Sequence, residues 1–75
     1  MGDRLPGLTA REVVKALEKA GFVMQRQKGS HVTLRHPQTK RTTVVSMHPG
    51  EVPRFFIRTI LKQAGISEAE FRKLI

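Results

Sequence analysis

The sequence predicts a small α+β protein, with helices packed on one face of a three-stranded antiparallel sheet. Three short strand-like runs lie in the middle of the chain, helical patterns lie on both sides of them, and the connections between the strands are tight. The 75 residues are the length of one domain, which we place over residues 1–75. The expected order of elements is α-β-β-β-α, followed by a short terminal helix.

The first helix is expected over residues 10–20, after an irregular lead-in over residues 1–8. Thr9 and Glu12 have the spacing of a capping box, in which two side chains bond backbone N–H groups at the helix start. Gly21 is placed to end the helix. The stretch between them carries apolar side chains at helical spacing, namely Val13, Val14, Leu17 and Ala20.

Three short strands are expected, over residues 22–28, 31–36 and 41–47. Gly29 and Ser30 supply a tight hairpin turn between the first two strands, because glycine reaches a positive φ without a Cβ clash. Residues 37–40 form the second turn. Consecutive strands with such short connections indicate an antiparallel meander.

The second strand has two different faces, because side chains alternate along a strand. Val32 and Leu34 are expected to point at the helices. His31, Thr33 and Arg35 then share the opposite face, which stays in water because two helices suffice to cover only one face of the sheet. The sequence therefore predicts an open sheet surface suited to a polar partner.

Two more helices are expected near the C-terminus. After a break at residues 48–51, Pro53 suits the first turn of a helix that ends at Gly65. The apolar face of this helix is expected to contain Phe56, Ile57, Ile60, Leu61 and Ala64. Ser67 and Glu70 repeat the capping-box spacing and open a last helix. Its inward side chains would be Phe71, Leu74 and Ile75.

The charge of the chain favours a polyanionic partner over a generally basic, solvated surface. Fourteen Lys and Arg against six Asp and Glu give a net charge of +8. Residues 21–63 hold eight of the basic residues and one acidic residue, a net charge of +7. A basic middle of this kind is typical of nucleic-acid binding. On the second main helix, a row of cations suits contact with phosphates or with an acidic protein surface: Arg54, Arg58 and Lys62.

The composition excludes several other classes of protein. The chain has no cysteine, which excludes disulfides and thiolate metal sites. The first residues lack the apolar run of a secretory signal, and no stretch is apolar enough to span a membrane. We therefore expect a soluble cytoplasmic protein with no membrane partner and no cofactor.

His31 is the candidate catalytic residue. Cleavage of an RNA phosphodiester needs a base for the 2′-hydroxyl proton, an acid for the leaving 5′-oxygen and positive charge near the phosphate. Histidine titrates near neutrality and suits either proton-transfer role. Arg26, Lys28 and Arg35 are candidate phosphate ligands on the adjacent strands. From spacing alone, however, a strand histidine beside a turn is more often a surface residue than a catalyst.

The other candidate groups favour structural roles. Ser30 has no acidic residue nearby to orient a Ser–His pair, so its turn-forming role is preferred to that of a nucleophile. His36 is expected to be a turn residue in preference to an acid catalyst, although it stays open as a second proton-transfer group. His48 is expected to have a structural or hydrogen-bonding role, with a second catalytic role left open. The three histidines match no compact zinc-ligand pattern.

Several segments along the chain share their pattern with one known family. They are residues 5–21, the run Arg26-Gln27-Lys28-Gly29-Ser30-His31, the run Arg35-His36-Pro37, residues 44–49, and residues 60–67 with Phe71. Together these segments resemble the HicA toxin family, also called YcfA-like, over nearly the whole chain.

The resemblance implies a fold like that of double-stranded-RNA-binding domains and a type II toxin that cleaves mRNA without a metal ion. It also implies that the histidine of the Gly-Ser-His motif, here His31, is catalytic and that a HicB antitoxin covers the site. The chain departs from the family where the second main helix begins, with Arg54-Phe55-Phe56-Ile57 in place of a small Gly-Thr-Leu-like segment. We interpret Phe55 as packing or antitoxin contact in preference to a base-stacking residue.

We therefore expect a metal-independent endoribonuclease of the HicA type. Its catalytic residue would be His31, presented by Gly29 and Ser30, and its RNA-binding residues would be Arg26, Lys28, Arg35, Arg54 and Arg58. One alternative is a non-catalytic RNA-binding module that uses the same basic face. A third possibility is an interaction protein whose basic surface holds an acidic partner.

Overall fold

The computed structural model describes residues 7–75, so the expected lead-in lies almost entirely outside the described residues. Its elements follow the expected order, and the α+β class is confirmed. They are α1 (Ala10–Lys19), β1 (Val23–Lys28), β2 (His31–Arg35), β3 (Thr42–Ser46), α2 (Arg54–Ala64) and α3 (Glu68–Arg72). Each strand is one or two residues shorter than expected.

The sheet is an antiparallel meander in the order β1-β2-β3. In the β2–β3 pair, His31 lies opposite Ser46 and Arg35 lies opposite Thr42. In the β1–β2 pair, Lys28 lies opposite His31, and the register shifts between Met24 and Arg26. This extra residue in β1 is a bulge, which bends a strand and increases its twist.

The expected start of α1 is confirmed in detail. The Thr9 N–H donates to Glu12 Oε1 at 2.9 Å, and the Glu12 N–H donates to Thr9 Oγ1 at 3.2 Å. These two bonds satisfy backbone donors that have no partner within the helix. At the other end, Gly21 has a φ of 104°, a conformation that glycine adopts without a Cβ clash.

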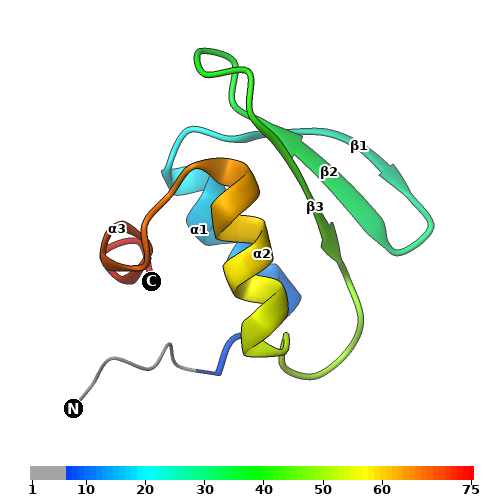
Figure 1. The fold of residues 1–75 in the computed structure, drawn as a ribbon. Coiled ribbons are helices and arrows are strands. Elements are labelled where there is room, and N and C mark those ends of the chain that lie inside the picture. The colour runs from blue at the N-terminus through cyan, green and yellow to red at the C-terminus, as the bar shows by residue number, and fades with distance from the viewer. Residues whose placement is uncertain (1–6) are drawn as a thin grey trace.

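Helices α1 and α2 lie side by side on one face of the sheet, and the end of the β1–β2 hairpin projects beyond them (Figure 1). As expected, Val32 and Leu34 of β2 are buried, while His31 on the other face is exposed. The core joins α1 and α2, strands β2 and β3, and α3. Its larger members are Val13, Leu17, Phe22, Val32, Leu34, Val45, Ile57, Ile60, Leu61 and Phe71.

Strand β1 differs from the expected two-layer arrangement, because all six of its residues are exposed. The helices therefore cover β2 and β3 but leave β1 in water on both faces. Gln27 pairs with Val32 and so lies on the helix side of the sheet, where it offers no apolar side chain to bury. The bulge at Gln25 also interrupts the pairing of β1 with β2.

Helix α2 buries Ile57, Ile60, Leu61 and Ala64 as expected, but the expectation that Phe56 is buried is wrong. Phe56 is 50% exposed, because it lies on the flank of α2 that faces a surface groove and not the core. At the start of the helix, Pro53 is the N-cap residue and not a residue of the first turn. At its end, Gly65 adopts the left-handed conformation with a φ of 73°.

Helix α3 begins with the expected capping box. The Ser67 N–H donates to Glu70 Oε1, and the Glu70 N–H donates to Ser67 Oγ, both at 3.0 Å. The bonds from Ser67 hold the pKa of the Glu70 carboxyl below its ordinary value of 4.5. Phe71 is fully buried, whereas the expectation that Ile75 faces inward is wrong because its side chain is exposed. Ile75 lies beyond the end of α3 and lines a shallow surface pocket beside α1.

Candidate active site and nucleic-acid interface

The open face of the sheet carries four of the candidate site residues. Residues paired across antiparallel strands place their side chains on the same face, about 4.5–5.5 Å apart at Cβ. One row across the sheet is therefore Lys28, His31 and Ser46. The next row contains Arg26, and Arg35 follows one row beyond. The structure thus places His31 on the same sheet face as the three cations expected to bind phosphates, with Lys28 beside it and Arg35 at the other end of β2.

The hairpin turn fixes His31 at the beginning of β2. Gly29 has a φ of 60° and occupies the first central position of the two-residue turn, where a type II′ turn takes glycine. The Ser30 carbonyl oxygen accepts a hydrogen bond of 2.6 Å from the Met47 N–H, which ties the turn to the end of β3. Gln27 Nε2 donates to the Gly29 carbonyl oxygen at 3.3 Å. Gly29 and Ser30, the two residues before His31, therefore each accept a hydrogen bond at their carbonyl oxygen.

A groove of about 450 Å³ opens beside His31, between β3 and α2. The sheet contributes His31, Val44 and Ser46 to its lining. Helix α2 contributes Phe56, Thr59 and Gln63, which lie on one flank because they are three and four residues apart. Most of these side chains are apolar or neutral, so the groove has an apolar wall beside a sheet face that is basic.

The loop between β3 and α2 brings a second histidine and a carboxylate to the same groove. His48 and Glu51 both line it. The loop is held from the other side by a hydrogen bond of 2.7 Å from the Val52 N–H to the Leu8 carbonyl oxygen, and by a β-bridge between Thr9 and Glu51. His31 and His48, which are far apart in sequence, therefore lie on one groove.

His36 occupies the β2–β3 turn, as expected. Its Nδ1 accepts hydrogen bonds of 3.2 Å from the backbone N–H groups of Gln38 and Thr39. Its ring also meets Phe22 edge to face, with 5.3 Å between ring centroids. These contacts commit the imidazole to the turn, at the end of β2 away from His31.

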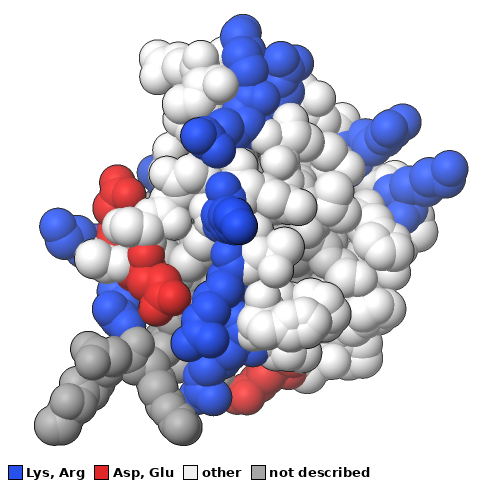
Figure 2. Space-filling model, in the orientation of Figure 1, with Lys and Arg blue, Asp and Glu red and all other residues white. Residues whose placement is uncertain are grey.

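The basic row on α2 lies on the flank opposite the groove. Arg54, Arg58 and Lys62 are absent from the groove lining, to which α2 contributes Phe56 and Gln63. Arg58 Nε lies 3.3 Å from Glu68 Oε2 of α3. In Figure 2, basic side chains form a column over α2, and other basic side chains stand apart beside the β1–β2 hairpin. The structure therefore separates Arg54 and Arg58 from the open face that holds His31.

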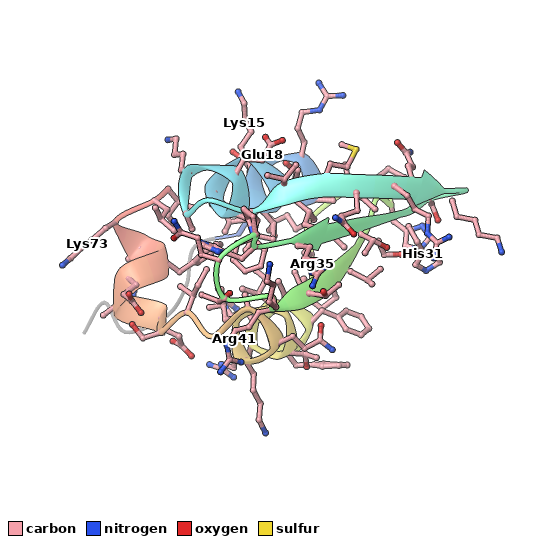
Figure 3. All side chains as sticks on the ribbon, turned by 90° about the horizontal axis from the view of Figure 1, so that it is seen from above. Lys15, Glu18, His31, Arg35, Arg41 and Lys73 are labelled. Atoms are coloured by element: carbon pink, nitrogen blue, oxygen red, sulfur yellow. The ribbon has the colours of Figure 1, made fainter. Side chains whose placement is uncertain are left out.

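Figure 3 shows His31 near the turn end of β2 and Arg35 toward the other end of the same strand. Lys15, Glu18 and Lys73 project from the helices, away from both residues (Figure 3). Within residues 7–75, no group of three or more His, Asp or Glu side chains is placed to hold a metal ion. In the same range, no helix is long and apolar enough to cross a membrane.

Comparison with known protein families identifies the family of this chain. The family model described as HicA toxin of bacterial toxin-antitoxin matches residues 10–66, which span α1 through the end of α2 and include the hairpin turn. The chain belongs to the HicA toxin family. Family membership makes it the toxin component of a toxin-antitoxin system, with an antitoxin as its partner. No curated relative matched this HicA chain.

Sequence reasoning missed the groove wall contributed by α2. The sequence pattern does not distinguish a buried Phe56 from one at the margin of the apolar stripe. The wall that Phe56 shares with Thr59 and Gln63 was therefore not predicted. The signal that pointed to an exposed aromatic ring was the adjacent pair Phe55-Phe56, because neighbouring residues of a helix do not share one face. Which flank of α2 faces the groove depends on how the helix is rotated against the sheet.

Proposed function

We propose that this HicA-family protein is an endoribonuclease that cleaves single-stranded RNA, with mRNA as its target, and that the reaction needs no metal ion. The observation that supports this proposal best is the position of His31. It lies on the open sheet face between Lys28 and Ser46, and it also lines the groove that His48 shares. A proton-transfer group, a cation and a second imidazole thus meet in one place.

The chemistry follows from these groups. One imidazole takes the proton of the ribose 2′-hydroxyl, and the 2′-oxygen attacks the adjacent phosphorus. The bond from phosphorus to the 5′-oxygen breaks, and an acid gives that oxygen its proton, which leaves a 2′,3′-cyclic phosphate and a free 5′-hydroxyl. We assign His31 to one proton transfer and His48 to the other. Each such transfer contributes typically about 10²–10⁴-fold in rate.

The cations of the open face support the charged parts of the substrate. Lys28, opposite His31, neutralises the phosphate as negative charge builds on its non-bridging oxygens. Arg26 and Arg35 bind neighbouring phosphates, for which the guanidinium fork is well suited. In this proposal, the scissile phosphate lies at the turn end of β2, and the rest of the RNA runs along the sheet face.

The proposed setting is the cytoplasm, where mRNA is present, and the proposed partner is a HicB-like antitoxin that covers the His31 face. The basic row on α2 offers that antitoxin a second contact. Arg58 pairs with Glu68 of α3 on this flank. An acidic partner would therefore contact a cation that already has one carboxylate beside it.

The test is cleavage of an end-labelled single-stranded RNA in EDTA, between pH 5 and 9. Wild type is expected to cut, and His31→Ala is expected to lose about 10²–10⁴-fold in rate. The side chain of His31 is exposed, so the variant should fold, and circular dichroism checks this. Equal rates in the two proteins would remove His31 from the mechanism. If neither protein cuts but both bind RNA, the chain is a non-catalytic RNA-binding module.

A further inference from the structure

The groove beside His31 has an aromatic wall that the cleavage chemistry does not use. Phe56 lines the groove and is 50% exposed, so one side of its ring is open to a ligand. The ring of Phe55 lies against it, with 4.2 Å between centroids and 40° between the ring planes. Phe55 does not line the groove. It contacts Phe56 from the outer side of α2.

We infer that the groove holds one nucleobase of the bound RNA, stacked on Phe56, next to the phosphate at His31. This inference rests on the proposed function for the class of ligand, but it assigns a binding role to residues outside the proton-transfer machinery. Phe56 would be a positioning residue, since it would hold the nucleotide whose ribose or phosphate meets His31.

The chemistry of the groove fits a base. Single-stranded RNA is recognised mainly by splaying bases out onto aromatic side chains and by hydrogen bonds to their edges. Thr59 and Gln63 line the same wall as Phe56 and carry polar groups. Gln63 Oε1 already accepts a bond of 2.8 Å from Thr43 Oγ1, which leaves the amide hydrogens as donors for a base edge.

The charge and the size of the site favour RNA over a protein segment. The apolar wall borders a face that holds Lys28, Arg26 and Arg35. A ligand that fills both parts of the site therefore needs an apolar ring and several negative charges. A nucleotide strand carries both at every step, because each base is attached to a phosphate. A volume of about 450 Å³ lies in the range of small-molecule sites, about 300–1,000 Å³.

The chain has no Trp and no Tyr, so a single introduced Trp is its only indole. We would compare Phe56→Trp with Phe55→Trp, the matched control on the neighbouring residue that lies outside the groove. The ligand is a mixed-sequence single-stranded oligonucleotide with 2′-O-methyl riboses, which lack the attacking hydroxyl and stay intact. Stacking of a base quenches indole fluorescence. Quenching is expected for Phe56→Trp and not for Phe55→Trp, and an abasic strand of the same length should quench neither.

Affinity gives a second readout, from the anisotropy of the labelled oligonucleotide. Phe56→Ala is expected to bind roughly 5- to 150-fold more weakly than wild type, the usual effect of removing one base–aromatic stack. The slope of log K against log salt should not change, because no phosphate contact is lost. Phe56→Tyr should restore the affinity, and Phe55→Ala should bind like wild type. Circular dichroism checks the fold of each variant.

Four outcomes would overturn the inference. One is tight binding of the oligonucleotide with no quenching of Phe56→Trp. Another is equal quenching by the abasic strand. A third is quenching that rises with protein concentration alone, which would identify a second copy as the occupant. The fourth is equal quenching by polyglutamate, which would identify an acidic protein segment. His31-dependent cleavage in EDTA is measured separately, so it can stand when stacking fails, and stacking can stand when cleavage fails.

Discussion

The environments of the three histidines distinguish their roles at the scale of single residues. His36 accepts two backbone hydrogen bonds at Nδ1 and packs against Phe22, so its imidazole organises a turn. His31 is exposed on the open sheet face, and both His31 and His48 line the groove. An imidazole that borders a groove on an exposed face is accessible to a substrate, whereas His36 is occupied by its own backbone.

We predict that His48→Ala lowers kcat by about 10²–10⁴-fold, with little change in the Kd for uncleavable RNA, because a proton-transfer group acts mainly in the transition state. The wild-type rate should fall on both sides of its pH optimum, and His31→Ala and His48→Ala should each lose one limb of that profile. The fold-loss of kcat in the double variant should be far smaller than the product of the fold-losses in the two single variants.

His36→Ala is the control for this experiment. It should lower the free energy of unfolding, because the turn loses two hydrogen bonds, and it should leave the shape of the pH profile unchanged. Additive effects of His31→Ala and His48→Ala, with both limbs of the profile retained in His48→Ala, would show that His48 does not share the reaction.

At the scale of elements, the contact between β3 and α2 sets the shape of the groove. Thr43 is 1% exposed, and its hydroxyl donates to Gln63 Oε1 at 2.8 Å. A buried hydroxyl needs such a partner, since leaving it unpaired costs about 1–3 kcal/mol. Gln63 itself is exposed and lines the groove, so this bond joins the core to the wall of the site.

We predict that the two ends of this bond respond differently to substitution. Gln63→Leu should lower the free energy of unfolding by about 1–3 kcal/mol, because the Thr43 hydroxyl stays buried without its acceptor. Thr43→Val keeps the shape and removes the hydroxyl, and the exposed Gln63 amide can bond to water. That variant should therefore lose at most about 1 kcal/mol. Urea unfolding followed by circular dichroism measures both, and equal losses would contradict the assigned bond.

At the scale of the whole molecule, the cations of the sheet face and those of α2 lie on two separate surfaces. The sheet face carries Arg26, Lys28 and Arg35 beside His31. The outer flank of α2 carries Arg58 and Lys62, with Glu68 of α3 paired to Arg58. The groove and its apolar wall lie between these surfaces. In the function proposed above, RNA uses only the sheet face, whereas the antitoxin contacts both surfaces.

We predict that RNA affinity depends on the sheet face and not on the flank of α2. For single strands, the slope of log K against log salt is about −0.7 for each phosphate contact. Arg26→Ala with Lys28→Ala should therefore make the slope shallower by about 1.4. Arg58→Ala with Lys62→Ala removes the same net charge and is the matched control, with an expected slope like that of wild type. Equal changes in both double variants would place RNA on both surfaces.

The order of the elements and their ends were predictable from the sequence because local interactions decide them. The capping boxes at Thr9 and Ser67 join residues three apart, and Gly21 and Gly65 are needed where the backbone turns left-handed. The alternation that exposes His31 follows from the pleat of a strand. These features need no knowledge of the rest of the fold.

Only the tertiary structure determines which helices, strands and side chains come into contact. Phe56 lies in the groove, β1 is uncovered, and the Arg58 flank is separated from His31, because the rotation of α2 and the bulge in β1 depend on contacts between residues far apart in the chain. Packing of the whole core fixes that rotation, since Ile57, Ile60 and Leu61 must all be buried at once. A pattern read along one helix identifies its apolar stripe, but the neighbouring layers determine what lies at its margins.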